Sequence, residues 1–129
     1  MKSGKILTLT LMWGLLTTFF PQIAKAERPA WGSGSGWQRV STKRRAECEL
    51  AAERKLKEYE ASGKLQKGTV RRIAGTGAEG RMAGKDAMFA VICAPEGDAV
   101  YVFDVCPDRV CRERPVIDLR NELGQTIFW

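Results

Sequence analysis

The chain has 129 residues, with 21 lysines and arginines, 15 acidic residues, four cysteines and no histidine. This length fits one domain and is too short for two. Without histidine there is no ordinary Ser–His or Cys–His nucleophile pair and no imidazole ligand for a metal ion. The composition therefore favours a binding or structural protein over an enzyme, with no cofactor and no metal site.

The first 26 residues have the features of a secretory signal peptide. Two lysines form a positively charged start, Ile6–Phe20 is an uncharged apolar run, and the tripeptide AKA at positions 24–26 is a typical cleavage site. Pro21 argues against an uncleaved membrane anchor. We therefore predict a periplasmic or secreted protein of a Gram-negative envelope, which begins at Glu27 and is not stably inserted in a membrane.

Removal of the signal peptide changes the charge. It takes away three lysines, which leaves 18 basic residues against 15 acidic ones, a net charge of +3. A charge of this size is an ordinary solubilising surface and gives no indication of nucleic-acid binding.

Residues 27–40 are predicted to form a flexible arm. Gly32–Gly36 alternates glycine and serine, as flexible linkers do, and is flanked by Trp31 and Trp37. The arm is either a terminus whose Trp37 packs on the domain or a mobile contact in which both tryptophans bind a ligand. The single domain is expected to span residues 41–129.

Ser41–Ser62 is the clearest helix. Ser41 or Thr42 is a candidate N-cap, the interior is rich in strong helix formers, and Gly63 ends the segment. At roughly 100° per residue, one narrow side is apolar. That side carries Cys48, Ala51, Ala52, Leu56 and Tyr59. The glutamates at positions 47, 49, 53, 58 and 60 are assigned to the solvent side.

The rest of the chain is predicted to be mostly strands and loops. Gly68–Ala74 is a plausible edge strand, and Gly75–Ala87 reads as a glycine-rich loop. This loop contains G-x-G-x-x-G, but no helix has room to follow it, so it is not a dinucleotide site. Pro115–Leu119 and Gln125–Trp129 are possible strands, whereas residues 118–124 fit a helical turn equally well.

Met88–Cys93 and Ala99–Val105 form the predicted central hairpin, with a turn that contains proline and glycine. Pairing Cys93 with Ala99 gives one uncharged face. Its members are Phe89, Val91, Cys93, Ala99, Tyr101, Phe103 and Val105.

The four cysteines all follow the signal peptide, so two disulfides are expected in an oxidising compartment. Cys93 lies at the turn end of the hairpin and Cys106 at its open end, about seven residues away. This separation exceeds the reach of a disulfide, and Cys111 must stay near Cys106. The remaining pairing is Cys48–Cys93 with Cys106–Cys111.

The Cys106–Cys111 bridge would close a short loop made of Pro107, Asp108, Arg109 and Val110. This loop is either a rigid binding element that presents Asp108 and Arg109 or a plain hairpin staple. A disulfide-closed C-x₄-C loop at a hairpin end is similar to the inhibitory loop of the Ivy-type lysozyme inhibitors. The likeness covers residues 106–111 alone and lacks the histidine of those loops. It implies an inhibitor-type role for the loop.

Together these features predict an α+β domain, with one amphipathic helix packed on an antiparallel sheet of three to five strands. We expect a small exported binding protein of inhibitor or immunity type, which presents the loop to a protein partner such as a cell-wall hydrolase. The alternative is a structural accessory subunit of a secretion, pilus or conjugation assembly. In that case the arm and the second side of the sheet would contact neighbouring subunits.

Overall fold

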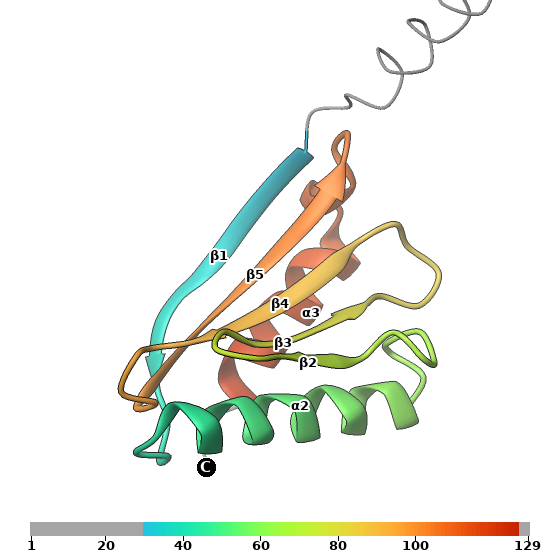
Figure 1. Cartoon of the computed structure of the whole chain (residues 1–129). Coiled ribbons are helices and arrows are strands. Elements are labelled where there is room, and N and C mark those ends of the chain that lie inside the picture. Colours follow the sequence, from blue (N-terminus) through green and yellow to red (C-terminus); the bar gives the residue numbers. More distant parts are fainter. Residues whose placement is uncertain (1–29, 127–129) are drawn as a thin grey trace, which may run out of the picture.

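The computed structural model describes residues 30–126, so the predicted signal peptide lies outside the described range. The chain forms a five-stranded antiparallel sheet of order β1-β5-β4-β3-β2, with two helices on one face (Figure 1). The elements are β1 Ala30–Arg39, α2 Arg45–Ala61, β2 Arg71–Ile73, β3 Gly77–Arg81, β4 Met88–Cys93, β5 Ala99–Pro107, the 3₁₀ turn η1 Val110–Arg112, and α3 Arg114–Thr126. The predicted α+β class is confirmed, and a second helix is added to it.

Helix α2 buries the predicted apolar side against β3 and β2. Its predicted N-cap is wrong, since the N-cap residue is Arg44 without a side-chain hydrogen bond. The Thr42 hydroxyl instead donates to the carbonyl of Gly97 (2.6 Å), in the turn between β4 and β5. Gly63 follows the helix with φ of 83°, a left-handed conformation that glycine adopts without steric cost.

Glu49 is a second correction on this helix. It was assigned to the solvent side, but it is 4% exposed. Its carboxylate accepts a hydrogen bond from the Gly75 N–H (2.7 Å) and lies 3.7 Å from Nε of Arg72. These partners compensate the buried charge and attach α2 to the end of β2.

The hairpin register differs from the prediction by one residue. Cys93 lies opposite Val100 and Phe89 opposite Asp104. The turn sets this register, because the Ala94 N–H donates to the Ala99 carbonyl (2.8 Å) and closes a four-residue connection. A shift of one residue moves every side chain of β5 to the other face. The even-numbered residues from Val100 to Cys106 are therefore buried. The predicted face is wrong for its members on β5, which are Ala99, Tyr101, Phe103 and Val105.

The predicted flexible arm is also wrong over residues 30–39, which form β1. This strand pairs antiparallel with β5 from Ala30, opposite Pro107, to Arg39, opposite Ala99. Gly34 serves packing, because a side chain at this position would overlap the ring of Tyr101. A glycine-rich segment that resembles a linker in sequence is thus a strand, and its lack of side chains makes room for the large Tyr101 side chain of β5.

Two further segments were predicted incorrectly. The glycine-rich loop contains β3, whose Gly77 allows close approach to the Val91 carbonyl. The strand predicted at Pro115–Leu119 is the start of α3, and Gln125 also belongs to that helix; residues 127–129 lie outside the described range. Val116, Leu119 and Leu123 are buried at helical spacing, and Pro115 is tolerated in the first turn.

Both predicted disulfides are present. Cys48–Cys93 joins α2 to β4 with a Cα–Cα distance of 6.1 Å, and Cys106–Cys111 joins the end of β5 to η1 with 5.5 Å. All four cysteines are buried in the core that both helices share with the inner face of the sheet.

A buried carboxylate attaches α3 and β1 to the sheet. Asp104 is fully buried, and its Oδ1 accepts hydrogen bonds from the N–H (2.8 Å) and hydroxyl (3.0 Å) of Ser33. Its Oδ2 lies 3.9 Å from a guanidinium nitrogen of Arg120, which also donates to the Ser33 hydroxyl. Strands β1 and β5 and helix α3 therefore meet at one buried carboxylate.

Replacing Cys48 and Cys93 together with alanine is expected to lower the free energy of unfolding by about 4 kcal/mol, because their bridge spans 45 residues. The same change at Cys106 and Cys111, five residues apart, should cost about 2 kcal/mol. Urea denaturation followed by circular dichroism measures both. Equal losses of unfolding free energy in the two double variants would contradict the expectation that the longer-range bridge stabilises the fold more.

Replacing Arg120 with methionine is expected to lower the free energy of unfolding by about 3 kcal/mol, since it leaves Asp104 as a buried, uncompensated charge. The double variant Asp104→Asn with Arg120→Met removes both charges and keeps an acceptor for Ser33. It should be more stable than the single Arg120 variant in the same denaturation experiment. A less stable double variant would rule out charge compensation as the reason.

A candidate binding surface

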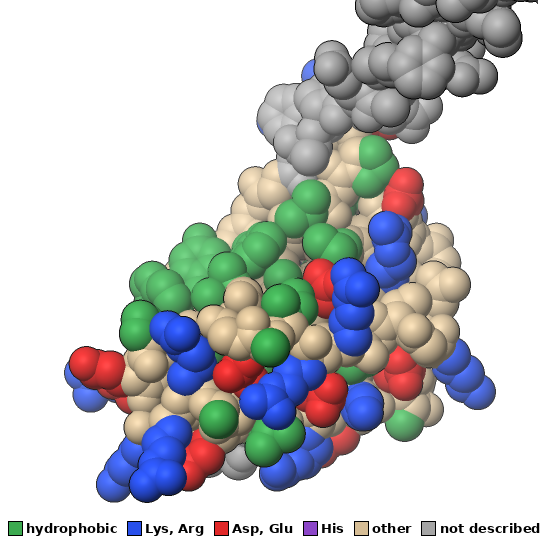
Figure 2. Space-filling model, viewed as in Figure 1, with side chains coloured by type: hydrophobic (Ala, Val, Ile, Leu, Met, Phe, Trp, Pro, Cys, Tyr) green, Lys and Arg blue, Asp and Glu red, His purple; other side chains and the backbone are tan. Residues whose placement is uncertain are grey.

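The face of the sheet opposite the helices carries an apolar surface, which we call the open face. Its members are Trp37, Met88, Ile92, Tyr101, Phe103 and Val105. In the described part of the chain both helices lie on the other face, so these side chains stay partly exposed. Figure 2 shows hydrophobic side chains gathered over β1, β5 and β4 on this side.

Trp37 is the most prominent member of the open face. It is 58% exposed and contacts the Tyr101 ring edge to face, with 5.6 Å between ring centroids. Beside this pair lies a shallow hollow of about 440 Å³, which is lined by Gly32, Gly34, Tyr101, Phe103 and neighbouring backbone. The hollow exists because the two glycines present no side chain next to large apolar ones.

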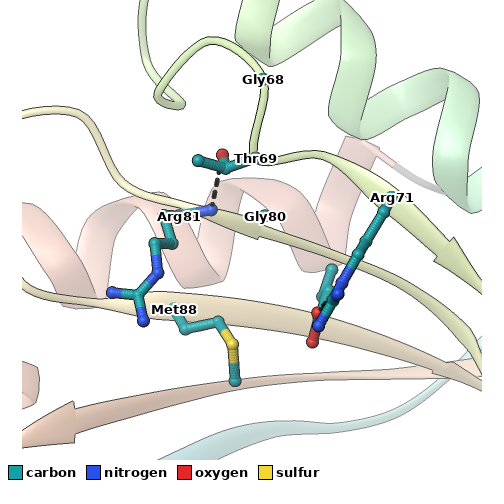
Figure 3. Close-up of a pocket in the computed structure, with 7 residues that line it drawn as sticks. Gly68, Thr69, Arg71, Gly80, Arg81 and Met88 are labelled. Carbon is teal, nitrogen blue, oxygen red and sulfur yellow. Dashed lines mark hydrogen bonds and ion pairs between the residues drawn. The ribbon is translucent and has the colours of Figure 1, made fainter.

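Charged residues border the apolar centre. On the β2 and β3 side, Arg71, Glu79 and Arg81 line a second hollow of about 260 Å³ together with Met88 (Figure 3). Arg71 donates to Glu79, and Arg81 lies 3.4 Å from Asp86. At the other border, exposed Arg39 follows Trp37 on β1.

The predicted binding loop lies at the end of this face. Asp108 and Arg109 are exposed, whereas Val110 packs against the core. Asp108 has φ of 53°, a left-handed conformation that aspartate adopts more readily than most residues. Because Pro107 shares the outward orientation of Val105 on β5, the loop continues the open face beyond the strand.

Of the two predicted arm contacts, only Trp37 lies far from the loop. Trp37 lies opposite Tyr101, and the loop starts six residues further along β5, or roughly 20 Å away at the rise of an extended strand. Trp31 lies opposite Cys106 and is therefore at the loop end of β1. Trp37 and the loop therefore lie at opposite ends of the β1–β5 pair.

Sequence reasoning assigned Tyr101 and Phe103 to the core and so missed the centre of this surface. Strand β5 is apolar at both its odd and its even positions, so alternation did not identify the exposed side. The signal that was available in the sequence is that β5 has more apolar residues than one buried face of a strand requires. One helix layer covers one face of a sheet, and an apolar second face then needs another cover.

The open face combines apolar side chains with a border of charged ones. Across residues 30–126 no three acidic, histidine or cysteine side chains lie close enough to hold a metal ion. The same residues contain no helix long and apolar enough to cross a bilayer. The pKa of Lys64 is raised by its hydrogen bond to Glu122 (2.7 Å), but this pair joins the segment that follows α2 to α3, away from the open face.

No protein family, curated protein or solved structure was found to match the chain.

A matched pair of valines tests the register that exposes this surface. Val102→Ala is expected to lower the free energy of unfolding by about 2 kcal/mol or more, because Val102 is fully buried. Val105→Ala should cost less than about 1 kcal/mol, because Val105 lies partly exposed on the open face. Thermal and urea denaturation give both values, and the reverse order would restore the predicted register.

Proposed function

We propose that this chain is an exported binding protein whose partner is another protein, and that the partner docks on the open face and the adjoining Cys106–Cys111 loop. The observation that carries the proposal is the hairpin register, which turns Tyr101 and Phe103 outward beside Trp37. Export is supported by the signal-peptide features of residues 1–26 and is compatible with the two disulfides.

The residue types on the surface favour a protein partner. Binding hot spots in protein interfaces are enriched in tryptophan, tyrosine and arginine, and apolar patches with a polar border mark such interfaces. The open face joins Trp37 and Tyr101 with a border that contains Arg39 and Arg71. Because these groups stand on strands of a sheet, binding would order their side chains but not the backbone that carries them.

The charges on the border indicate the character of the partner. Arg71 is already paired with Glu79, and Arg81 with Asp86, whereas Arg39 has no ion-pair partner among the described residues. The open face therefore suits a partner surface with an apolar centre and an acidic group near the Trp37 end. Such charge complementarity sets orientation and association rate more than affinity.

The loop supports the inhibitor or immunity type of binding protein. Its ends are held by two buried cysteines, and its last residue, Val110, packs against the core, while Asp108 and Arg109 are exposed. A projecting loop held in this way can enter the cleft of an enzyme such as a cell-wall hydrolase with little loss of conformational entropy.

A structural subunit of an envelope assembly is the second candidate. The observation in its favour is the extent of the apolar surface, which runs over β1, β5 and β4. A neighbouring subunit would cover such a surface permanently, and the loop would then matter little.

Site-specific photo-crosslinking in the native host separates these candidates. A photoreactive phenylalanine analogue at Phe103 or Asp108 is expected to form an adduct with one envelope protein. The same analogue at Leu50, which is 47% exposed on α2, should form none. A soluble hydrolase in the adduct supports the inhibitor, and a membrane-complex subunit supports the structural role.

Binding of the purified partner then tests the surface itself. Phe103→Lys should weaken the affinity by at least about tenfold, since a charge at the centre of the interface must be desolvated. Leu50→Lys is the matched control and should leave the affinity unchanged, with folding of both variants verified by circular dichroism. An adduct confined to Leu50, or equal affinity of both variants, would refute the proposed surface.

A further inference from the structure

The two edges of the sheet are unequal. The outer strand β2 has three residues, and its exposed Arg71 and Arg72 hinder pairing with another strand. The outer strand β1 has ten residues and carries no charge or proline until Arg39, its last residue. A register shift between Gly34 and Trp37 interrupts this edge, but the residues on both sides of it, up to Gln38, lack the charges and prolines that hinder pairing with another strand.

Among residues 30–126 no strand pairs with the outer side of β1, and the backbone groups on that side can be assigned. The Val102 N–H donates to the Ser35 hydroxyl (3.1 Å), so the even-numbered residues of β5 direct their backbone groups toward β1. In an antiparallel ladder these groups alternate in direction along each strand. The residues of β1 opposite odd-numbered positions of β5 therefore direct their N–H and C=O groups away from the sheet. They are Ala30, Gly32, Gly34, Trp37 and Arg39.

We propose that β1 pairs antiparallel with β1 of a second copy of this chain, which joins two sheets into one continuous ten-stranded sheet. The outward groups of one copy would hydrogen-bond with those of the other. This pairing uses the edge of the sheet and not the open face, so it is independent of the proposed partner.

Three features favour a second copy as the occupant. Residues 30–38 are uncharged, so the paired strands bring no like charges together, and antiparallel pairing places the two Arg39 side chains at opposite ends of the ladder. A twofold contact between identical edges also closes on itself. The remaining edges of such a dimer are the two β2 strands, whose arginines stop further growth into a fibre.

The dimer would enlarge the binding surface. The twofold axis between antiparallel neighbours in one sheet stands perpendicular to the sheet. Both open faces therefore lie on the same side, and all helices on the other. Two loops and two Trp37 side chains would then be presented on one continuous surface.

Sedimentation equilibrium of the exported chain, after signal removal, tests the pairing. The mass is expected to rise from one chain to two as the protein concentration increases. Trp37→Pro should weaken this association by at least about tenfold, because proline removes an outward N–H without removing a bond to β5. Trp37→Ala is the matched control, since it also lacks the indole but keeps the N–H, and should dimerise more tightly than the proline variant.

Hydrogen exchange of the unmodified chain provides a second measurement that does not depend on folding of a variant. The amides of Gly32, Gly34 and Trp37 should gain protection as concentration rises, whereas that of Arg72 on β2 should not. A single-chain mass at every concentration would overturn the proposal, and so would a dimer in which the β1 amides stay unprotected. Phe103→Lys should still dimerise, so loss of the partner and loss of the dimer are separate outcomes.

Discussion

The hydrogen bond that closes the Ala94–Ala99 turn determines most of what this protein presents to its surroundings. It fixes which residues of β5 face the helices and which face outward, because strand side chains alternate with a period of two. Gly97 permits this turn with φ of 75°, and a side chain there would overlap the backbone at Arg44. The turn is thus held by the chain segment that leads into α2, and the hairpin and the helix fix each other.

The inner side of β5 then performs two different tasks. Val100 and Val102 are fully buried and supply apolar contacts to the core. Asp104 interrupts them with a charge, which costs desolvation but has Ser33 and Arg120 as partners. The apolar residues stabilise the fold in a general way, whereas the carboxylate specifies where β1 and α3 attach. Valine at position 104 would keep the apolar contacts but would lose the polar contacts that position β1 and α3.

The outer side of the same strand carries the features that point to binding. The open face, the Cys106–Cys111 loop and the outer edge of β1 are adjacent but distinct. The open face would bind through its side chains and the loop through a constrained turn. The edge of β1 would bind through its backbone groups. The glycines of β1 make room for the outward side chains of β5 and leave the backbone of the strand accessible at its outer edge. Gly34 accommodates the Tyr101 ring, and the small residues leave the edge unshielded. The same composition that resembles a linker in sequence produces a strand open to contact on its free side.

Local signals in the sequence were sufficient for several elements. The stripe from Cys48 to Tyr59 specified the buried side of α2, because a helical period is visible within one segment. The disulfide pairing also followed from the sequence, since the reach of a bridge excludes the alternatives even when the hairpin register is wrong by one residue. Only the tertiary structure decided the rest. Glu49 is buried because Gly75 and Arg72 approach it from another part of the chain, and Ala30–Arg39 is a strand because β5 offers it a ladder. The exposure of Tyr101 and Phe103 depended on a turn hydrogen bond and on both helices lying on one face. Each of these outcomes is set by contacts between distant segments, which the pattern of one segment does not contain.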